Sequence, residues 1–166
     1  MAALDAMERD EFTRVVGPVF EHSPWIAVAA WPRRPFRTLD ALHHAMCEVA
    51  AQAGEARQVA LIQAHPDLVS RAAAAGTLTP ASVDEQASAG LDRLSADEAA
   101  AFHEFNARYR ERFGFPFVIC ARLKKKEAIL AAFPVRLRNS REQEIETALA
   151  EIGKIARLRL ADLIEH

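Results

Sequence analysis

Apolar and polar residues follow the period of an α-helix over most of this chain. One such segment lies between Thr38, which caps the predicted helix, and Gly54, which stops it. The same pattern predicts further helices at residues 10–16, 24–31, 56–64, 80–90, 96–113, 125–132 and 141–165. Only residues 115–121 look extended, and a single strand cannot build a sheet. We therefore expect an all-α, single-domain helical bundle of about six to eight helices with irregular active-site loops, over residues 1–166.

Local signals mark where these helices begin and end. Ser23 and Thr79 each stand directly before a proline, which is typical of an N-cap followed by proline at the first helical position. Ser95 and Ser140 each stand three residues before Glu or Gln, which predicts two capping boxes. Pro134 is expected to end the preceding helix, because proline disrupts a helix interior.

The composition is that of an ordinary globular protein. The chain has 166 residues, of which 51% are hydrophobic and 27% charged, and its formal net charge is −2. This balance gives no reason to expect a nucleic-acid or membrane surface. No apolar run is long enough to span a bilayer, and the first residues do not resemble a signal peptide. A cytoplasmic enzyme or binding protein is the default expectation.

Cysteine and histidine usage predicts no metal site. Cys47 and Cys120 lie in apolar patterns, as buried free thiols do, and no CxxC or Cys/His pattern is present. His43 and His44 are adjacent and project about 100° apart on a helix, so they cannot bind one ion as an i, i+4 pair would. His103 stands on a predicted helix without a ligand partner at suitable spacing.

His65 is the first candidate for chemistry. It precedes Pro66, and a residue before proline is pushed out of the helical region. Its imidazole is therefore expected to project from a bend at a helix end, where it could exchange a proton near neutral pH. The alternative is a histidine that only terminates the helix, where its charge favours the C-terminal dipole.

A second candidate lies in "SVDEQ", residues 82–86. Ser82, Glu85 and Gln86 are three and four positions apart, so they share one face of a helix, whereas Asp84 points elsewhere. A hydroxyl, a carboxylate and an amide together could bind a small polar ring. The alternative is structural, since Ser82 and Glu85 also fit a capping box.

The apolar segment "FGFPFVICA", residues 113–121, is punctuated by Gly114 and Pro116. It is either a buried connector or a pocket wall whose extended backbone offers N–H and C=O groups to a ligand.

In the last predicted helix, Arg159 falls inside an apolar stripe. A guanidinium at such a position is costly unless it is paired. Its partner is either a carboxylate of the protein or an anionic substrate, which it could bind with a bidentate fork.

Taken together, these motifs closely resemble the OHCU decarboxylase family, where OHCU is 2-oxo-4-hydroxy-4-carboxy-5-ureidoimidazoline, formed during urate degradation. The resemblance rests on "HPDL" at 65–68, on Ser82-x-x-Glu85-Gln86 followed by "AGL", and on "FGFPF" at 113–117. It extends to the last helix and so covers nearly the whole chain. Two departures are Ser70, where family members often carry glycine, and Leu123, where many have glycine after arginine.

The resemblance implies a cofactor-independent, homodimeric enzyme that converts OHCU to (S)-allantoin and CO2. His65 would be the catalytic acid–base residue. Glu85 would be the second catalytic residue, which holds the hydroxyl or ureido N–H groups of the substrate and tunes the imidazole. By motif match the substrate would be bound by Pro66, Ser82, Val83, Asp84, Glu85, Gln86, Phe117, Val118, Ile119, Cys120, Ala121 and Arg159. Family members in peroxisomes end in a targeting tripeptide that this chain lacks, which suits a cytoplasmic enzyme.

Two other functions stay open from the sequence. One is a non-catalytic helical protein that binds an allantoin-like ligand with the same pocket. The other is a hydrolase of the ureido group, in which His65 and Glu85 would activate water and release ammonia or urea instead of CO2.

Overall fold

A computed structural model describes residues 1–70 and 75–165, and every helix and loop among them is part of an all-α fold without a strand. The chain divides into two compact units, Met1–Ala64 with Ile152–His166, and His65–Glu151. The first contains α1 (Ala2–Ala6), α2 (Arg9–Val16), η1 (Gly17–Val19), α3 (Trp25–Ala30), η2 (Trp31–Arg33), α4 (Leu39–Ala51) and α5 (Glu55–Gln63). The second contains α7 (Pro80–Ser88), α8 (Ala96–Phe113), η3 (Ala121–Leu123) and α9 (Lys126–Arg136). Both contribute residues to α10 (Arg141–Glu165). The all-α prediction is confirmed, and the assignment of a single domain stays a prediction.

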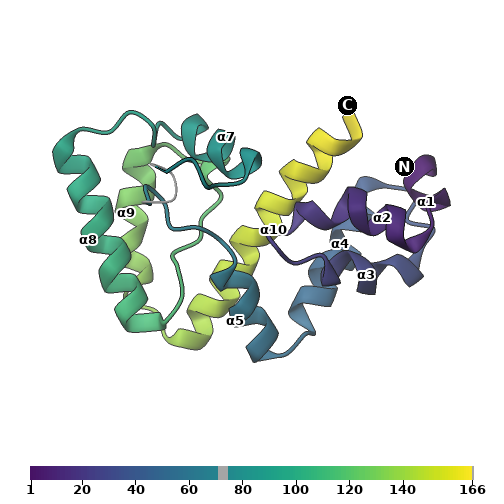
Figure 1. The fold of residues 1–166 in the computed structure, drawn as a ribbon. Coiled ribbons are helices and arrows are strands. Elements are labelled where there is room, and N and C mark those ends of the chain that lie inside the picture. Colours follow the sequence, from purple (N-terminus) through teal and green to yellow (C-terminus); the bar gives the residue numbers. More distant parts are fainter. Residues whose placement is uncertain (71–74, 166) are drawn as a thin grey trace. The chain divides into compact units, whose positions relative to one another are not determined.

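Each of the eight predicted helices is present, and the short helix α1 is an additional one (Figure 1). Their starts follow the sequence signals in most cases. Thr38 Oγ1 accepts the Ala41 N–H at 3.1 Å, and Ser95 forms a complete capping box with Glu98. Ser140 forms the other predicted box, since its N–H donates to Gln143 and its hydroxyl accepts the Gln143 N–H.

Two predicted helix ends are wrong. Ser23 does not cap α3, because its hydroxyl turns back and donates to the Glu21 carbonyl at 2.9 Å. Pro134 does not end α9, which continues to Arg136. A proline removes only one backbone donor, and here the following turn is secured because Arg136 is buried and paired with Glu144.

Apolar side chains of the first unit form its core around α3 and α4, which pack directly against each other. The fully buried members are Phe12, Val16, Ile26, Ala27, Ala30, Leu42, Met46, Leu61, Ile62, Ala156 and Leu160. The unpredicted helix α1 is tied to this unit by Asp5, whose carboxylate accepts the N–H groups of Phe36 and Arg37. The helices α2, α3, α4, α5 and α10 each contribute buried apolar side chains to this core, and this burial holds them together.

Aromatic side chains dominate the core of the second unit. Aromatic residues are only 7% of the chain, yet one cluster joins six of the nine phenylalanines to the sole tyrosine. Its members are Phe102, Phe105, Tyr109, Phe113, Phe115, Phe117 and Phe133. The cluster lies between α8 and α9, which contact each other, and includes the rings of Phe115 and Phe117. Figure 1 shows these two helices next to each other. The segment that was predicted as a connector or pocket wall is thus anchored by its own rings.

Candidate active site

His65 lies immediately after α5, whose C-cap is Ala64, and its side chain is buried at 6% exposure. The position at a helix end therefore agrees with the prediction from Pro66. Burial limits the water around the imidazole and holds the ring in place, which suits a group that transfers a proton to a bound ligand. Its participation in chemistry stays a prediction.

The second motif forms a buried polar face on α7. Ser82, Glu85 and Gln86 share one face of α7, as their spacing predicted, and all three are buried. Thr79 is the N-cap, since its hydroxyl oxygen accepts the Ser82 N–H at 3.3 Å. Ser82 therefore lies inside the helix, and the interpretation of Ser82 and Glu85 as a capping box is wrong. A hydroxyl, a carboxylate and an amide on one buried helix face are polar groups of the kind that line a binding site for a polar ligand.

Val83 and Asp84 lie on the other side of α7, where both side chains are exposed. The Val83 N–H is already bonded to the Thr79 carbonyl at 3.0 Å. The structure thus does not bring these two side chains to the buried face, and their predicted contact with substrate stays a prediction.

Gln86 connects this face to the loop that carries His65. Its Oε1 accepts the Val69 N–H at 3.2 Å, four residues after His65. The loop that follows His65 and the α7 motif are therefore joined by a direct hydrogen bond within one unit.

Three side chains on successive turns of α8 bind the same loop, and we call His103, Asn106 and Arg110 the loop clamp. Arg110 Nε lies 3.0 Å from each carboxylate oxygen of Asp67. Asn106 Nδ2 donates to the Leu68 carbonyl at 2.8 Å. His103 Nε2 lies 2.9 Å from the Val69 carbonyl, which requires that this nitrogen carries the proton. Three consecutive loop residues are thus bound by one helix face.

Two features at the contact between the loop and the loop clamp are energetically unfavourable. Val69 has φ of 55°, a left-handed conformation that β-branched residues rarely adopt. Asn106 is buried, and its Oδ1 has no hydrogen-bond partner among residues 1–70 and 75–165. Strained backbone and unsatisfied buried polar atoms are costly, and they concentrate at functional sites.

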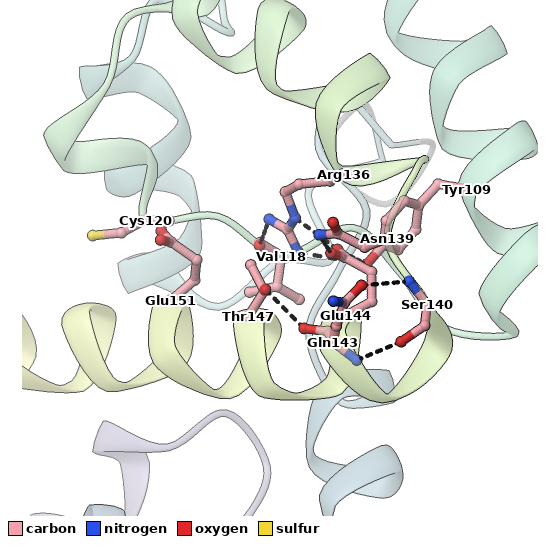
Figure 2. A network of polar contacts seen from close by, with 10 residues as sticks. All are labelled: Tyr109, Val118, Cys120, Arg136, Asn139, Ser140, Gln143, Glu144, Thr147 and Glu151. Atoms are coloured by element: carbon pink, nitrogen blue, oxygen red, sulfur yellow. Dashed lines mark hydrogen bonds and ion pairs between the residues drawn. The ribbon is translucent and has the colours of Figure 1, made fainter.

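Residues 117–121, the predicted pocket wall, are buried throughout. Figure 2 shows how a polar network holds this segment. Arg136 Nη1 donates to the Val118 carbonyl at 2.6 Å, and its guanidinium lies 4.2 Å from the centre of the Phe117 ring. At the other end, Glu151 accepts the Cys120 N–H at 2.9 Å. Two backbone groups that were expected to face a ligand, the Val118 carbonyl and the Cys120 N–H, are therefore hydrogen-bonded to side chains of the protein instead.

Glu144 lies at the centre of the network and is completely buried (Figure 2). Its carboxylate accepts hydrogen bonds from Arg136 at 2.6 Å, Tyr109 at 2.5 Å and Asn139 at 2.9 Å. Burial, followed by the hydrogen bond to Glu144, raises the pKa of Tyr109. The phenol therefore stays protonated and serves as a fixed donor.

Arg159 is buried in the first unit, as its place in the apolar stripe predicted. Its Nη1 lies 2.8 Å from Glu21 Oε2, and that carboxylate is also buried. Of the two predicted partners, the protein carboxylate is present. The contact of Arg159 with substrate stays a prediction.

A family model described as OHCU decarboxylase matches residues 5–161. The chain belongs to the OHCU decarboxylase family. A 2-oxo-4-hydroxy-4-carboxy-5-ureidoimidazoline decarboxylase of Amia calva is 41% identical over 165 residues, which are 99% of this chain and 94% of that protein. A crystal structure of (S)-allantoin synthase matches with a TM-score of 0.78 and 27% identity, over 98% of this chain and 53% of that one. Another, of OHCU decarboxylase in the presence of (S)-allantoin, matches with a TM-score of 0.71 and 25% identity, over 96% and 100%.

Several residues that shape the site in this member of the OHCU decarboxylase family were not predicted as functional. They are His103, Asn106, Arg110, Arg136, Glu144 and Glu151. For Asn106 a signal exists, because Phe102, Asn106 and Tyr109 follow one another at helical spacing and are all buried. Glu144 and Glu151 likewise share a face of α10 with Ala148. A polar residue in an apolar stripe was the signal used for Arg159, and it applies equally to these positions.

Two further observations concern the described residues only. They contain no group of three or more His, Cys, Asp or Glu side chains placed to hold a metal ion. None of their helices combines the length and the apolar content that a membrane crossing requires.

Proposed function

We propose that this protein is a cofactor-independent carboxy-lyase that converts OHCU to (S)-allantoin and CO2. The observation that carries the proposal is the link between the His65 loop and the buried polar face of α7, made by the Gln86–Val69 hydrogen bond. This link supports one site in which an imidazole, a carboxylate, an amide and a hydroxyl act together. Membership of the OHCU decarboxylase family supplies the substrate.

The chemistry needs little beyond these groups. When the bond from the ring carbon to the carboxylate breaks, CO2 leaves, and the electron pair moves into the adjoining C=N or carbonyl of the ring. The adjoining, ureido-bearing carbon of that C=N then takes up one proton, while the hydroxyl gives its own proton to the ring nitrogen and becomes the carbonyl of allantoin. Delivery of the proton to one face of the ureido-bearing carbon gives one enantiomer. The substrate is its own electron sink, so the protein has only to orient it, stabilise the anion and supply the proton.

His65 is the proposed proton donor, and Glu85 holds the substrate hydroxyl or its ureido N–H groups. Gln86 and Ser82 lie on the same buried face as Glu85 and complete its polar surface. The segment 117–121 supplies an apolar wall. An apolar wall lowers the local dielectric, which strengthens each hydrogen bond to the developing charge.

We further propose a cytoplasmic homodimer that acts as one domain over residues 1–166. Cys47 and Cys120 form no disulfide within the described part of the chain, as is usual in a reducing compartment. The dimeric state follows from the family resemblance, and light scattering of the purified protein tests it.

The decisive experiment generates OHCU in place, from urate with the two upstream enzymes, and follows circular dichroism with and without this protein. We expect rapid formation of the (S)-allantoin signal. His65→Asn should lower kcat by about 10²–10⁴-fold, the usual contribution of a general acid–base group. His44→Asn is the matched control, because the His44 side chain is 75% exposed and pairs only with Glu48 in the contacts described.

The alternatives give different results. A binding protein without activity would leave allantoin to form slowly and as a racemate, and a ureido hydrolase would release ammonia or urea. Full turnover by His65→Asn would remove His65 from the mechanism while leaving the reaction itself established.

A further inference from the structure

The loop that follows His65 is bound at three consecutive residues by one helix. Arg110, Asn106 and His103 contact residues 67, 68 and 69 respectively. We propose that this loop clamp, and Asn106 above all, positions the His65 imidazole for proton delivery. The proposal rests on the function of His65 proposed above and concerns residues that do not themselves need to touch the substrate.

The covalent distance between the clamp and His65 is short. Leu68, whose carbonyl binds Asn106, is three residues from His65. Between them stands Pro66, whose ring fixes its own φ and restricts the backbone of the residue before it. The segment between the clamped carbonyl and the imidazole is therefore short and has a restricted backbone. A shift of the loop at residue 68 is expected to displace His65 as well.

The conformation of Val69 shows that the loop is held against its own preference. A valine with φ of 55° is strained, because its branched side chain crowds the backbone. Both of its backbone polar groups are bound, the N–H by Gln86 and the carbonyl by His103. α7 and α8 thus fix this residue from two sides, and the fixed point lies four residues from His65.

Asn106 is the most informative member of the clamp because it is buried among apolar side chains. Its neighbours on the same face of α8, Phe102 and Tyr109, are fully buried. The Asn106 amide satisfies the Leu68 carbonyl, while its own Oδ1 has no hydrogen-bond partner in the described part of the chain. An apolar side chain would avoid that unsatisfied acceptor. The amide is therefore explained by the loop carbonyl that it holds and not by the packing of the helix.

Four variants test the inference in the full-length protein, each made in the wild-type and in the His65→Asn background. Asn106→Leu keeps a similar volume without the amide. His103→Ala removes the bond to Val69, whereas His103→Gln retains an N–H donor at about the same reach. Glu104→Gln is the control, because Glu104 lies on α8, is 73% exposed and is paired at 3.9 Å with Arg108, its one ion-pair partner among residues 1–70 and 75–165.

We expect Asn106→Leu to lower kcat by about 10²-fold with KM little changed, since small displacements of a reacting group can cost that much. His103→Ala should lower kcat less, and His103→Gln should restore most of it. In the His65→Asn background, Asn106→Leu and His103→Ala should have little further effect, because the group that they position is already absent. Thermal unfolding followed by circular dichroism verifies that each variant is folded, and the His103 pair carries the test if Asn106→Leu does not fold.

The possible failures are distinguishable. If the protein does not decarboxylate OHCU, or if His65→Asn is fully active, the proposed function fails and the clamp has nothing to position. If His65→Asn is impaired but the clamp variants keep wild-type kcat, the clamp inference alone is wrong. It is also wrong if the clamp variants lower the rate by the same factor in both backgrounds, since that result indicates a general structural role.

Discussion

Arg136 and Glu144 form a buried ion pair, and we expect its disruption to lower the free energy of unfolding by several kcal/mol. The Arg136 side chain is 8% exposed and Glu144 is 0% exposed, with 2.6 Å between Nε and Oε1. Arg136→Met keeps most of the apolar volume but removes the charge. It also removes the donor to the Val118 carbonyl and the cation that lies over the Phe117 ring.

The expected magnitude follows from what is left behind. In Arg136→Met, Glu144 keeps its bonds to Tyr109 and Asn139, but its negative charge has lost the only cation paired with it among the contacts described. Removing one partner of a buried pair typically costs about 3–5 kcal/mol. For a domain of this size, each kcal/mol lowers Tm by about 2–4 °C, so the melting temperature should fall by roughly 6–20 °C.

Urea unfolding followed by circular dichroism measures this effect, with the slope m checked for constancy. Tyr109→Phe is the comparison, because it removes the hydrogen bond to Glu144 and the long one from Arg136 Nη2 at 3.4 Å but leaves the ion pair intact. It should cost about 1.5–3 kcal/mol, the range for hydrogen bonds to charged groups. The double variant Arg136→Met, Glu144→Gln should lose less stability than the sum of the losses in the two single variants. The reason is that it leaves no unpaired charge in the interior.

Two results would refute this reasoning. One is a loss below about 1 kcal/mol in Arg136→Met, which is the range of an exposed ion pair. The other is strict additivity of the two single substitutions, which would mean that the side chains do not interact energetically.

Two further predictions concern the same network. The raised pKa of Tyr109 means that the folded state holds the phenol proton more tightly than the unfolded state does. Its contribution to the free energy of unfolding is therefore complete below about pH 10. Above that pH the contribution falls by about 1.4 kcal/mol per pH unit. Tyr109 is the only tyrosine, so the near-ultraviolet absorbance of tyrosinate tests this directly, and ionisation of the native protein at an ordinary tyrosine pKa would contradict it. Glu151→Ala removes the acceptor of the Cys120 N–H and should cost about 1.5–3 kcal/mol in urea unfolding, whereas Glu151→Gln retains an oxygen acceptor and should cost less. Equal losses in both variants would show that the hydrogen bond is not the cause.

The helices were predictable from the sequence because their signals are local. Thr38, Ser95 and Ser140 bind N–H groups within three residues, so their caps depend on little else. The prediction for Pro134 is wrong because burial of the neighbouring side chains outweighs the local preference of proline to end a helix. The buried neighbours of that turn, Phe133 and Arg136, keep α9 helical beyond the proline.

The site was predictable as far as it lies within single motifs. The shared face of Ser82, Glu85 and Gln86 follows from helical geometry alone. The partner of Arg159 does not, since Glu21 is 138 positions away in the sequence. The same holds for Asp67 and Arg110, which are 43 positions apart. Periodicity identifies which polar side chains are buried, but the choice of partner depends on the packing of distant segments.

The loop clamp also sets a limit on changes in chain length. Its three contacts run in opposite order along the two segments, so that residues 103, 106 and 110 meet residues 69, 68 and 67. Inserting or deleting one residue between His65 and Val69 would either break one or more of these pairings or change the number of residues between the clamp and His65. The interval from 65 to 69 is therefore constrained in length, and an insertion that preserves both the clamp and the position of His65 has to fall outside it.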